Sequence, residues 1–230
     1  AWNTLDALSW YYDNYTINEV YTNWDTYNLE QSIMDTDILL IPMGHWVSNY
    51  DYYSFRNVIE NYTSNGGNVI FTGSNNNGYG VYDDAYGYYS FCCSEMAFDN
   101  MNYDENHPIM NGVGSEYDIF EAYTNYIHDS GSYSNFESIF NIDPEYGYGY
   151  DYSHLISRVN VGLGSVTILG SAFWIYTDDE AMVLANIVRS SGADLDFVSF
   201  EPSDGVISPG ESIDVTLKIK SLSFNPGEYN

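Results

Sequence analysis

The chain has 230 residues, 44% of them hydrophobic, and carries 33 acidic but only five basic residues, so its formal net charge is −28. Such a charge repels phosphate backbones and anionic lipid surfaces, which excludes nucleic acid and membrane surfaces as favoured partners. No run of about 18 apolar residues occurs, so no membrane span is expected. Salt or bound calcium would relieve the repulsion among the carboxylates, and no other cofactor is expected.

The N-terminal part of the chain predicts short elements. Residues 3–12 are expected to form a helix, residues 17–22 a short strand, and residues 28–35 a short helix or turn. A doubly wound domain normally begins with a strand, whereas this chain begins inside the helix. We therefore expect the first strand to lie upstream in a longer precursor or to come from another chain.

The stretch from Asp37 to Gly73 predicts a strand, a helix and a second strand. Residues 38–41 form an uninterrupted apolar run, as a strand buried on both faces requires. Apolar residues then recur at helical spacing until Gly66 and Gly67, which end the helix because glycine enters the left-handed region without cost. Residues 69–71 form the second buried strand. The stretch is therefore expected to be a right-handed βαβ unit of a parallel sheet.

The middle of the chain predicts a long irregular region and then strands. Residues 75–90 are rich in tyrosine, asparagine and glycine, and residues 106–113 are punctuated as a turn. Residues 117–128 are ambiguous. Residues 162–164 predict a hairpin turn between the last two strands. Strands are expected near residues 88–93 and over residues 137–142, 154–161 and 165–170.

The C-terminal part predicts a helix and then a change of pattern. Thr177 and Glu180 form a capping box at the start of a helix that ends at Gly192. Residues 213–220 alternate strictly between apolar and polar, as in a half-buried strand. Turn residues flank this strand, so the segment predicts the opening of an antiparallel β-sandwich. Two domains are expected, over residues 1–192 and 193–230.

Four motifs carry a resemblance to a known superfamily: DILLIPMG at 37–44, NGGNVIFTG at 65–73, NHPIMNGV at 106–113 and VGLGSVTILGS at 161–171. In this order they make the first domain similar to the class I glutamine-amidotransferase-like (flavodoxin-like) superfamily, especially its non-catalytic versions in large secreted proteins. The second domain resembles the start of the Ig-like repeats of such proteins. The resemblance implies an α/β fold with a doubly wound, mostly parallel sheet, a partial β-sandwich, and an extracellular or cell-surface location.

Catalytic members of the superfamily carry a cysteine nucleophile after the strand that corresponds to residues 69–72 and a histidine after the last strand. In this sequence the first position falls on Gly73 or Ser74, and the second falls on residues 171–172 (Ser-Ala). Because neither a cysteine nor a histidine occupies these positions, the resemblance does not carry the activity over.

Polar residues at other positions leave a catalytic alternative open. A pair of Ser74 and His45 with Asp83 would mimic a hydrolase site, although the flanking sequence is not G-x-S-x-G. His107 is expected to stabilise its turn.

The remaining histidines and acidic runs give no metal pattern. His128 and His154 have no partner at metal-ligand spacing. Residues 102–105 and 178–180 offer oxygen ligands for calcium without an EF-hand pattern, and the capping role explains the second run more simply.

Two kinds of covalent modification are predicted. Cys92 and Cys93 are adjacent, and a vicinal disulfide is favoured over two buried thiols because the rest of the chain looks extracellular. That bridge would be strained, since neighbouring Cα atoms lie only about 3.8 Å apart. Asn14 and Asn61 each begin an N-x-T motif and are candidate glycosylation sites.

Tyrosine is unusually frequent, with 25 residues, many of them in predicted loops at 75–90 and 143–152. Its side chain provides a large contact area at low entropy cost and keeps a polar tip. Such loops suit sugar stacking, protein contact or lateral assembly, and packing onto the chain's own surface is the plainer alternative. The candidate interaction residues are Tyr79, Tyr82, Tyr86, Tyr88, Tyr89, Tyr146, Tyr148 and Tyr150.

These observations predict a non-catalytic extracellular structural or interaction module. The unfinished sheet edges at both ends favour a subunit of a surface filament or layer, whose partners are copies of itself or neighbouring domains of a larger precursor. An excerpt of a larger protein would explain the same edges. One alternative is an accessory domain of a secreted hydrolase that binds a glycan or a peptide, and another is a degenerate hydrolase.

Overall fold

The computed structural model describes most of residues 1–193 and a few short parts of the remaining chain. The described residues are 2–19, 26–42, 49–73, 85–91, 96–99, 103–120, 122–127, 136–142, 153–193, 198–201, 212 and 216–219. The helices are α1 (Trp2–Ser9), α2 (Thr26–Ile33), α3 (Asn49–Ser64), the short 3-10 helix η2 (Pro108–Met110) and α4 (Asp178–Val188), which continues as a π-helical turn over Arg189–Ala193.

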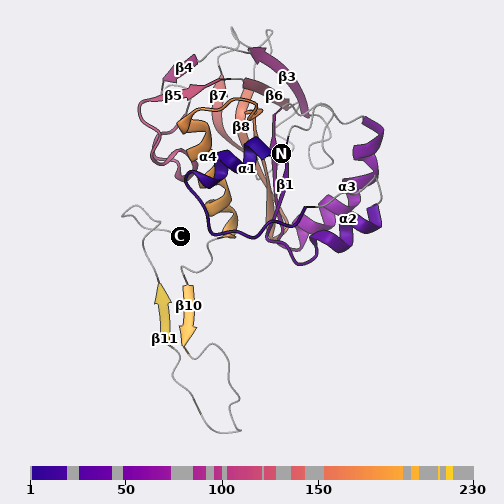
Figure 1. Cartoon of the computed structure of the whole chain (residues 1–230). Coiled ribbons are helices and arrows are strands. Elements are labelled where there is room, and N and C mark those ends of the chain that lie inside the picture. Colours follow the sequence, from indigo (N-terminus) through magenta and orange to yellow (C-terminus); the bar gives the residue numbers. More distant parts are fainter. Residues whose placement is uncertain are drawn as a thin grey trace.

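A mixed seven-stranded sheet forms the centre of the fold, in the order β1-β2-β9-β8-β6-β3, with β7 also paired to β8. A separate pair, β4 (Met96–Asp99) and β5 (Glu116–Ile119), lies beside α4 (Figure 1). The strands of the main sheet are β1 (Ile38–Ile41), β2 (Asn68–Thr72), β3 (Ala85–Phe91), β6 (Ala122–Ile127), β7 (Phe136–Ile142), β8 (Ser153–Val161) and β9 (Gly164–Leu169).

The prediction of a mostly parallel sheet is wrong for the described strands. Only the pairs β1–β2 and β2–β9 are parallel, whereas β8 pairs antiparallel with β9, β7 and β6, and β6 with β3. The cause is local, because a two-residue turn at Gly162 and Leu163 joins β8 to β9. Parallel neighbours need a crossover of a dozen residues or more, so such a turn can join only antiparallel strands.

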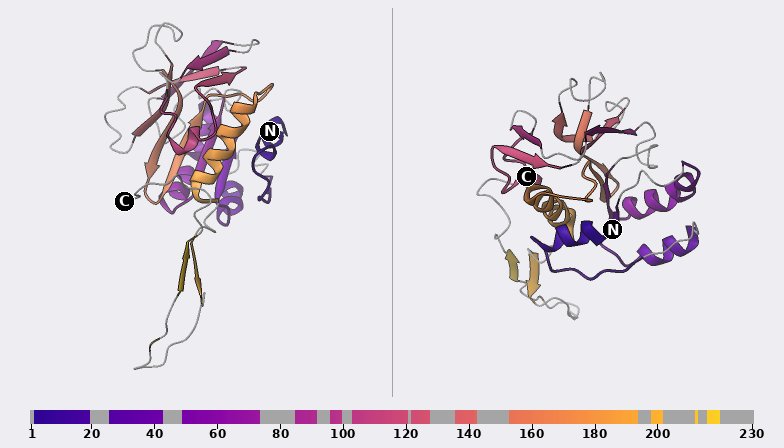
Figure 2. Two further views of the ribbon diagram at one scale, coloured as in Figure 1. Left: turned by 90° about the vertical axis from the view of Figure 1, so that its left-hand side faces the viewer. Right: turned by 45° about the horizontal axis from the view of Figure 1, so that its top comes forward.

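Helices cover both faces of the sheet, so the fold has three layers (Figures 1 and 2). On one face, α1 and α4 pack on an apolar cluster that includes Leu8, Ile70 and Leu184. On the other face, α2 and α3 pack on a second cluster that includes Ile59 and Val69. Successive residues of β2 therefore point into opposite cores, as the alternation of side chains along a strand requires. The architecture is α/β, as predicted.

The predicted end of the βαβ helix is confirmed. Gly66 has a φ of +107°, its N–H donates to the Thr63 carbonyl (3.0 Å), and the Gly67 N–H donates to the Tyr62 carbonyl (3.0 Å). These two bonds form a Schellman motif. β1 differs from its prediction, because all four of its residues are only half-buried. In the described sheet β1 lies at an edge, and a strand at an edge keeps one side open.

The other predicted elements are mostly present. The capping box of α4 is confirmed, since Thr177 Oγ1 accepts from the Glu180 N–H and Glu180 Oε2 accepts from the Thr177 N–H. The strand predicted over 17–22 is wrong for residues 17–19, which have no regular structure, and residues 20–22 lie outside the described part. The ambiguous stretch 117–128 contains most of β5 and the whole of β6.

The predicted sandwich segment is described only as two antiparallel strands, β10 (Val198–Glu201) and β11 (Thr216–Ile219). They form their own two-stranded sheet and stand apart from the three layers (Figures 1 and 2). Every helix in the described ranges is too short or too polar to cross a membrane.

Candidate functional site

The carboxyl ends of β2 and β9 meet at one edge of the sheet. The Gly73 N–H donates to the Leu169 carbonyl (3.0 Å), and the Gly170 N–H donates to the Leu155 carbonyl (2.8 Å). Gly73 and Ser171, which the sequence analysis compared with the superfamily's nucleophile and histidine positions, thus follow neighbouring strand ends. Ligands of α/β proteins bind at this edge of the sheet.

Two residues after Ser171 the backbone adopts a strained conformation. Phe173 has a φ of +57°, a region that L side chains other than asparagine and aspartate rarely adopt. Its side chain is buried in the core under α4. The turn thereby presents the next two residues outward, and Trp174 and Ile175 are 54% and 55% exposed. Strain of this kind costs about 1–3 kcal/mol and gathers at functional positions.

Helix α1 holds this turn in place. Asn3 Nδ2 donates to the Trp174 carbonyl (2.8 Å), and the Tyr176 hydroxyl donates to the Asp6 carboxylate. The Trp10 ring, 51% exposed, packs edge-to-face on the Tyr176 ring with centroids 5.0 Å apart. We call Trp10, Trp174, Ile175 and Tyr176 the aromatic surface.

A buried polar cluster of Tyr117, Ser171 and Glu180 lies close to this turn. Glu180 Oε2 accepts from the N–H groups of Thr177 (2.9 Å) and Phe120 (3.2 Å). The Ser171 hydroxyl lies near the Glu180 carboxylate and the Tyr117 hydroxyl and acts to lower the pKa of both groups. Three buried atoms of the cluster nevertheless have no partner in hydrogen-bond geometry among the described residues: Glu180 Oε1, Ser171 Oγ and the Tyr117 hydroxyl.

The electrostatics of the cluster follow from its burial. Burial raises the pKa of Glu180 to about 7, against the opposing effect of the two N–H donors. Burial likewise raises the pKa of Tyr117, and the Glu180 carboxylate raises it further. An ionisable group whose pKa is shifted close to 7 by its environment is typical of functional sites.

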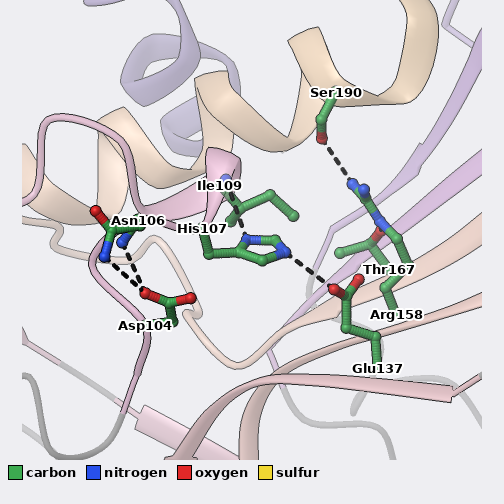
Figure 3. Close-up of polar contacts among 8 residues, drawn as sticks. All are labelled: Asp104, Asn106, His107, Ile109, Glu137, Arg158, Thr167 and Ser190. Atoms are coloured by element: carbon green, nitrogen blue, oxygen red, sulfur yellow. Dashed lines mark hydrogen bonds and ion pairs between the residues drawn. The ribbon is translucent and has the colours of Figure 1, made fainter. Parts of the chain in front are cut away.

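Figure 3 draws two further sets of polar contacts, one that joins η2 to β7 and one that joins β8 to β9 and to the turn after α4. His107 Nδ1 accepts from the Ile109 N–H (3.2 Å), and its Nε2 lies 3.1 Å from Glu137 Oε1. Arg158, opposite Glu137 in the β7–β8 pair, donates to Thr167 Oγ1 (3.0 Å) and Ser190 Oγ (2.7 Å). The predicted role of His107 in its turn is confirmed, and both sets of contacts link separate elements of the fold.

Described carboxylates in the two acidic runs considered for calcium accept hydrogen bonds from the chain. Asp104 accepts from the Asn106 N–H (2.9 Å) and Nδ2 (3.2 Å), which lowers the pKa of Asp104 (Figure 3). Asp179 Oδ2 accepts from the Asp118 N–H (2.8 Å). Across the described ranges, no three His, Cys, Asp or Glu side chains converge as a metal site.

The histidine in β8 is buried rather than poised for chemistry. His154 Nδ1 lies within hydrogen-bond distance of Ser138 Oγ (2.8 Å) and Asn141 Oδ1 (2.7 Å). Burial lowers the pKa of His154 to about 4, so its imidazole is neutral at physiological pH. The other candidates for a hydrolase or metal site, His45, Ser74, Asp83 and His128, lie outside the described residues.

The predicted interaction and modification residues are only partly described. Asn14 and Asn61 are both exposed. Three candidate tyrosines lie on β3, where Tyr86, Tyr88 and Tyr89 are in register with residues of β6. Residues outside the described part are Tyr79, Tyr82, Cys92, Cys93, Tyr146, Tyr148 and Tyr150.

A groove of about 820 Å³ lies at the opposite, amino end of β2 and β9, with Met34, Asn61 and Leu163 among its lining residues. Several of its polar groups bond to the chain itself. Ser165 Oγ donates to Asn68 Oδ1 (2.8 Å), and Asn68 Nδ2 donates to the Ser191 carbonyl (2.6 Å). We place the candidate site at the carboxyl end, where exposed aromatic groups and buried polar atoms without described partners occur together.

Sequence reasoning missed the aromatic surface and the Glu180 cluster. A signal was available, because the apolar run Phe173-Trp174-Ile175 stands between a strand end and a helix cap, where polar turn residues are usual. The contact between Trp10 and Tyr176 could not be predicted from local sequence, since it depends on how α1 packs beside the turn.

Comparison with known proteins defines the fold alone. No protein-family model matches the chain, and no curated protein matches its sequence. Among solved structures, the mmIFT52 N-terminal domain is similar over 81% of this chain and 87% of that one, at 9% identity and a TM-score of 0.50. A ThuA-like protein of Bacteroides uniformis matches over 72% and 73% (12% identity, TM-score 0.49), and a cytoplasmic protein of Salmonella typhimurium over 82% and 85% (13%, 0.48).

Proposed function

We propose that this chain is a non-catalytic interaction module that binds its partner through the aromatic surface. One observation carries the proposal: Trp10, Trp174 and Ile175 are each more than half exposed, beside the edge at which α/β folds bind ligands. Clustered exposed apolar side chains on a soluble domain mark an interaction site. Tryptophan is also among the residues that dominate binding energy when an interface covers them.

The rigidity of this surface supports the same function. Phe173 anchors the turn in the core, and Asn3 and Asp6 fasten it to α1 through their side chains. A surface that is ordered before binding loses little conformational entropy on binding. The amidotransferase-like (flavodoxin-like) relationship, the Ig-like segment and the extracellular location remain parts of the proposal, supported by the sequence motifs.

The binding test starts from an unbiased peptide library selected on the wild-type chain. We expect the selected peptides to bind the variant Trp10→Ala/Trp174→Ala at least about tenfold more weakly. The matched control, Tyr27→Ala/Leu163→Ala, removes two side chains that are 67% and 85% exposed elsewhere and should bind as the wild type does. Equal binding of the selected peptides to all three proteins would place the interaction elsewhere and refute the proposal.

The absence of catalysis is tested separately with chromogenic ester, peptide and glycoside substrates. We expect no turnover above that of the variants Ser74→Ala and His45→Ala, because the superfamily's nucleophile and histidine positions carry other residues. Turnover by the wild type that either variant abolishes would establish the degenerate hydrolase instead.

A second candidate function, assembly into a filament or layer, is favoured by β1. This strand consists of Ile38, Leu39, Leu40 and Ile41, and in the described sheet it pairs only with β2. An apolar edge strand without a charge is a template for pairing with another chain. Negative-stain electron microscopy and sedimentation of the native material at rising salt should then reveal ordered polymers. Particles of single-chain mass at every salt concentration would rule this function out.

A further inference from the structure

The aromatic surface has acidic neighbours. Asp6 bonds to Tyr176, and the negative charges of Asp178 and Asp179 add to burial in raising the pKa of Tyr11, the residue after Trp10. Asp178 is exposed at the start of α4. A molecule that covers Trp10 and Tyr176 therefore meets carboxylates at the rim.

A basic residue close to this surface, Arg189, is turned toward the chain itself. Arg189 donates to Asn186 Oδ1 (2.9 Å) and to the Tyr11 carbonyl, and its guanidinium lies over the Tyr12 ring, 5.7 Å from the centroid. Its guanidinium therefore joins the end of α4 to the residues that follow α1, and it does not point toward the aromatic surface. This contact also shows that a cation over an aromatic ring is compatible with the local structure.

We propose that the partner of the aromatic surface is a cationic protein segment, one that presents lysine or arginine beside an apolar side chain. This inference rests on the proposed function and specifies its partner. The exposed tryptophan faces attract cations through the ring quadrupole, and the carboxylates of Asp6 and Asp178 add charge complementarity at the rim. Ile175 supplies an apolar contact for the uncharged part of the segment.

The charge of the whole chain separates this partner from other occupants. A second copy brings a further net charge of −28 to the contact, so self-docking through this surface is repelled at physiological salt. A neutral sugar would stack on the tryptophans and could donate hydroxyl hydrogen bonds to the carboxylates, but it would bring no charge to balance theirs. A cationic segment gains from both, and its approach is accelerated by the field of the acidic protein.

The experiment uses the full chain and three synthetic peptides with leucines in a glycine–serine background. Their remaining positions are lysine in the probe, glutamine in the neutral control and glutamate in the acidic control. Binding is measured by calorimetry at about 0.15 M salt. We expect the lysine peptide to bind most tightly and to lose at least about tenfold in affinity to Trp10→Ala/Trp174→Ala. That variant keeps the net charge, so general attraction to an acidic protein cannot produce the loss.

Two further variants sharpen the result. Asp178→Asn should weaken binding of the lysine peptide by roughly two- to fivefold and leave that of the glutamine peptide unchanged, as a partly exposed ion pair predicts. Tyr27→Ala/Leu163→Ala should bind all three peptides as the wild type does. Circular dichroism and urea unfolding of each variant establish that it is folded.

The outcomes distinguish this inference from the function on which it rests. If the glutamine peptide binds as tightly as the lysine peptide and depends on the tryptophans, the cationic partner is refuted and the interaction module stands. If every peptide binds Trp10→Ala/Trp174→Ala as tightly as the wild type, the cationic partner of the aromatic surface is refuted. The peptide-library selection then decides whether the chain is an interaction module. If sedimentation shows self-association that the tryptophan variant abolishes, the occupant is a second copy and the inference fails.

Discussion

The two ends of β2 and β9 differ in how well their polar groups and backbone are accommodated. At the amino end, Asn68 bonds to both Ser165 and Ser191, and Gly164 lies against the backbone of the α3 terminus. At the carboxyl end, Phe173 is strained and Glu180 keeps a buried oxygen without a partner among the described residues. Structure that serves only stability seldom keeps such costs. The difference shows an amino end whose polar groups are satisfied within the fold, and it supports the proposal that the partner binds at the carboxyl end.

The largest effect is expected at the amino end from Gly164→Ala. An added Cβ would lie 2.0 Å from the Gly67 carbonyl oxygen and 2.6 Å from that of Thr63, so backbone must move apart. We expect the free energy of unfolding in urea to fall by more than about 3 kcal/mol. The matched control is Gly114→Ala, whose Cβ would meet nothing within 4 Å and should change stability by less than about 0.5 kcal/mol. Similar stability of the two variants would contradict the close backbone approach at Gly164.

The next effect is a pH dependence at the carboxyl end. Burial raises the pKa of Glu180 from 4.5 to about 7, so the folded state holds a proton that the unfolded state releases. The stability that this proton provides is complete below pH 4.5 and is lost as the pH rises through 7. The loss amounts to roughly 3 kcal/mol.

Glu180→Gln tests this effect, because an amide occupies the same space without ionising. The stability of the wild type relative to this variant should fall by roughly 3 kcal/mol as the pH rises across that window. Unfolding in urea at several pH values measures it, and the exposed Glu105→Gln serves as the control. If the free energy of unfolding of the wild type and of Glu180→Gln changed with pH in the same way, ionisation of buried Glu180 would not destabilise the fold.

A smaller loss is expected from Asn68→Ala. The change leaves the Ser165 hydroxyl and the Ser191 carbonyl without their partner in the packed end of the sheet. We expect a loss of about 2 kcal/mol in the free energy of unfolding, with peptide binding at the aromatic surface unchanged. The exposed Asn57→Ala is the control, and a loss of peptide binding by Asn68→Ala would show that the two ends are coupled.

How far the sequence predicts these two ends depends on the range of the interactions. The end of α3 at Gly66 and the capping box of Thr177 and Glu180 join residues a few positions apart, so local patterns were enough. The half-buried β1 and the antiparallel half of the sheet depend on which strands become neighbours. The aromatic surface brings Trp10 to Tyr176 from distant parts of the chain, and only the packing of α1 beside α4 creates it.

The smallest effect on stability is expected from Trp174→Ala, and it is the sharpest test of the comparison. The side chain is 54% exposed, and its backbone carbonyl, which accepts from Asn3, is kept in the variant. The free energy of unfolding should therefore change by less than about 0.5 kcal/mol. If it falls by more than about 1 kcal/mol instead, Trp174 packs on the chain itself and belongs with the stabilising residues. Unchanged unfolding together with weakened peptide binding would assign this large apolar side chain to a partner, since the chain's own stability gives no reason to expose it.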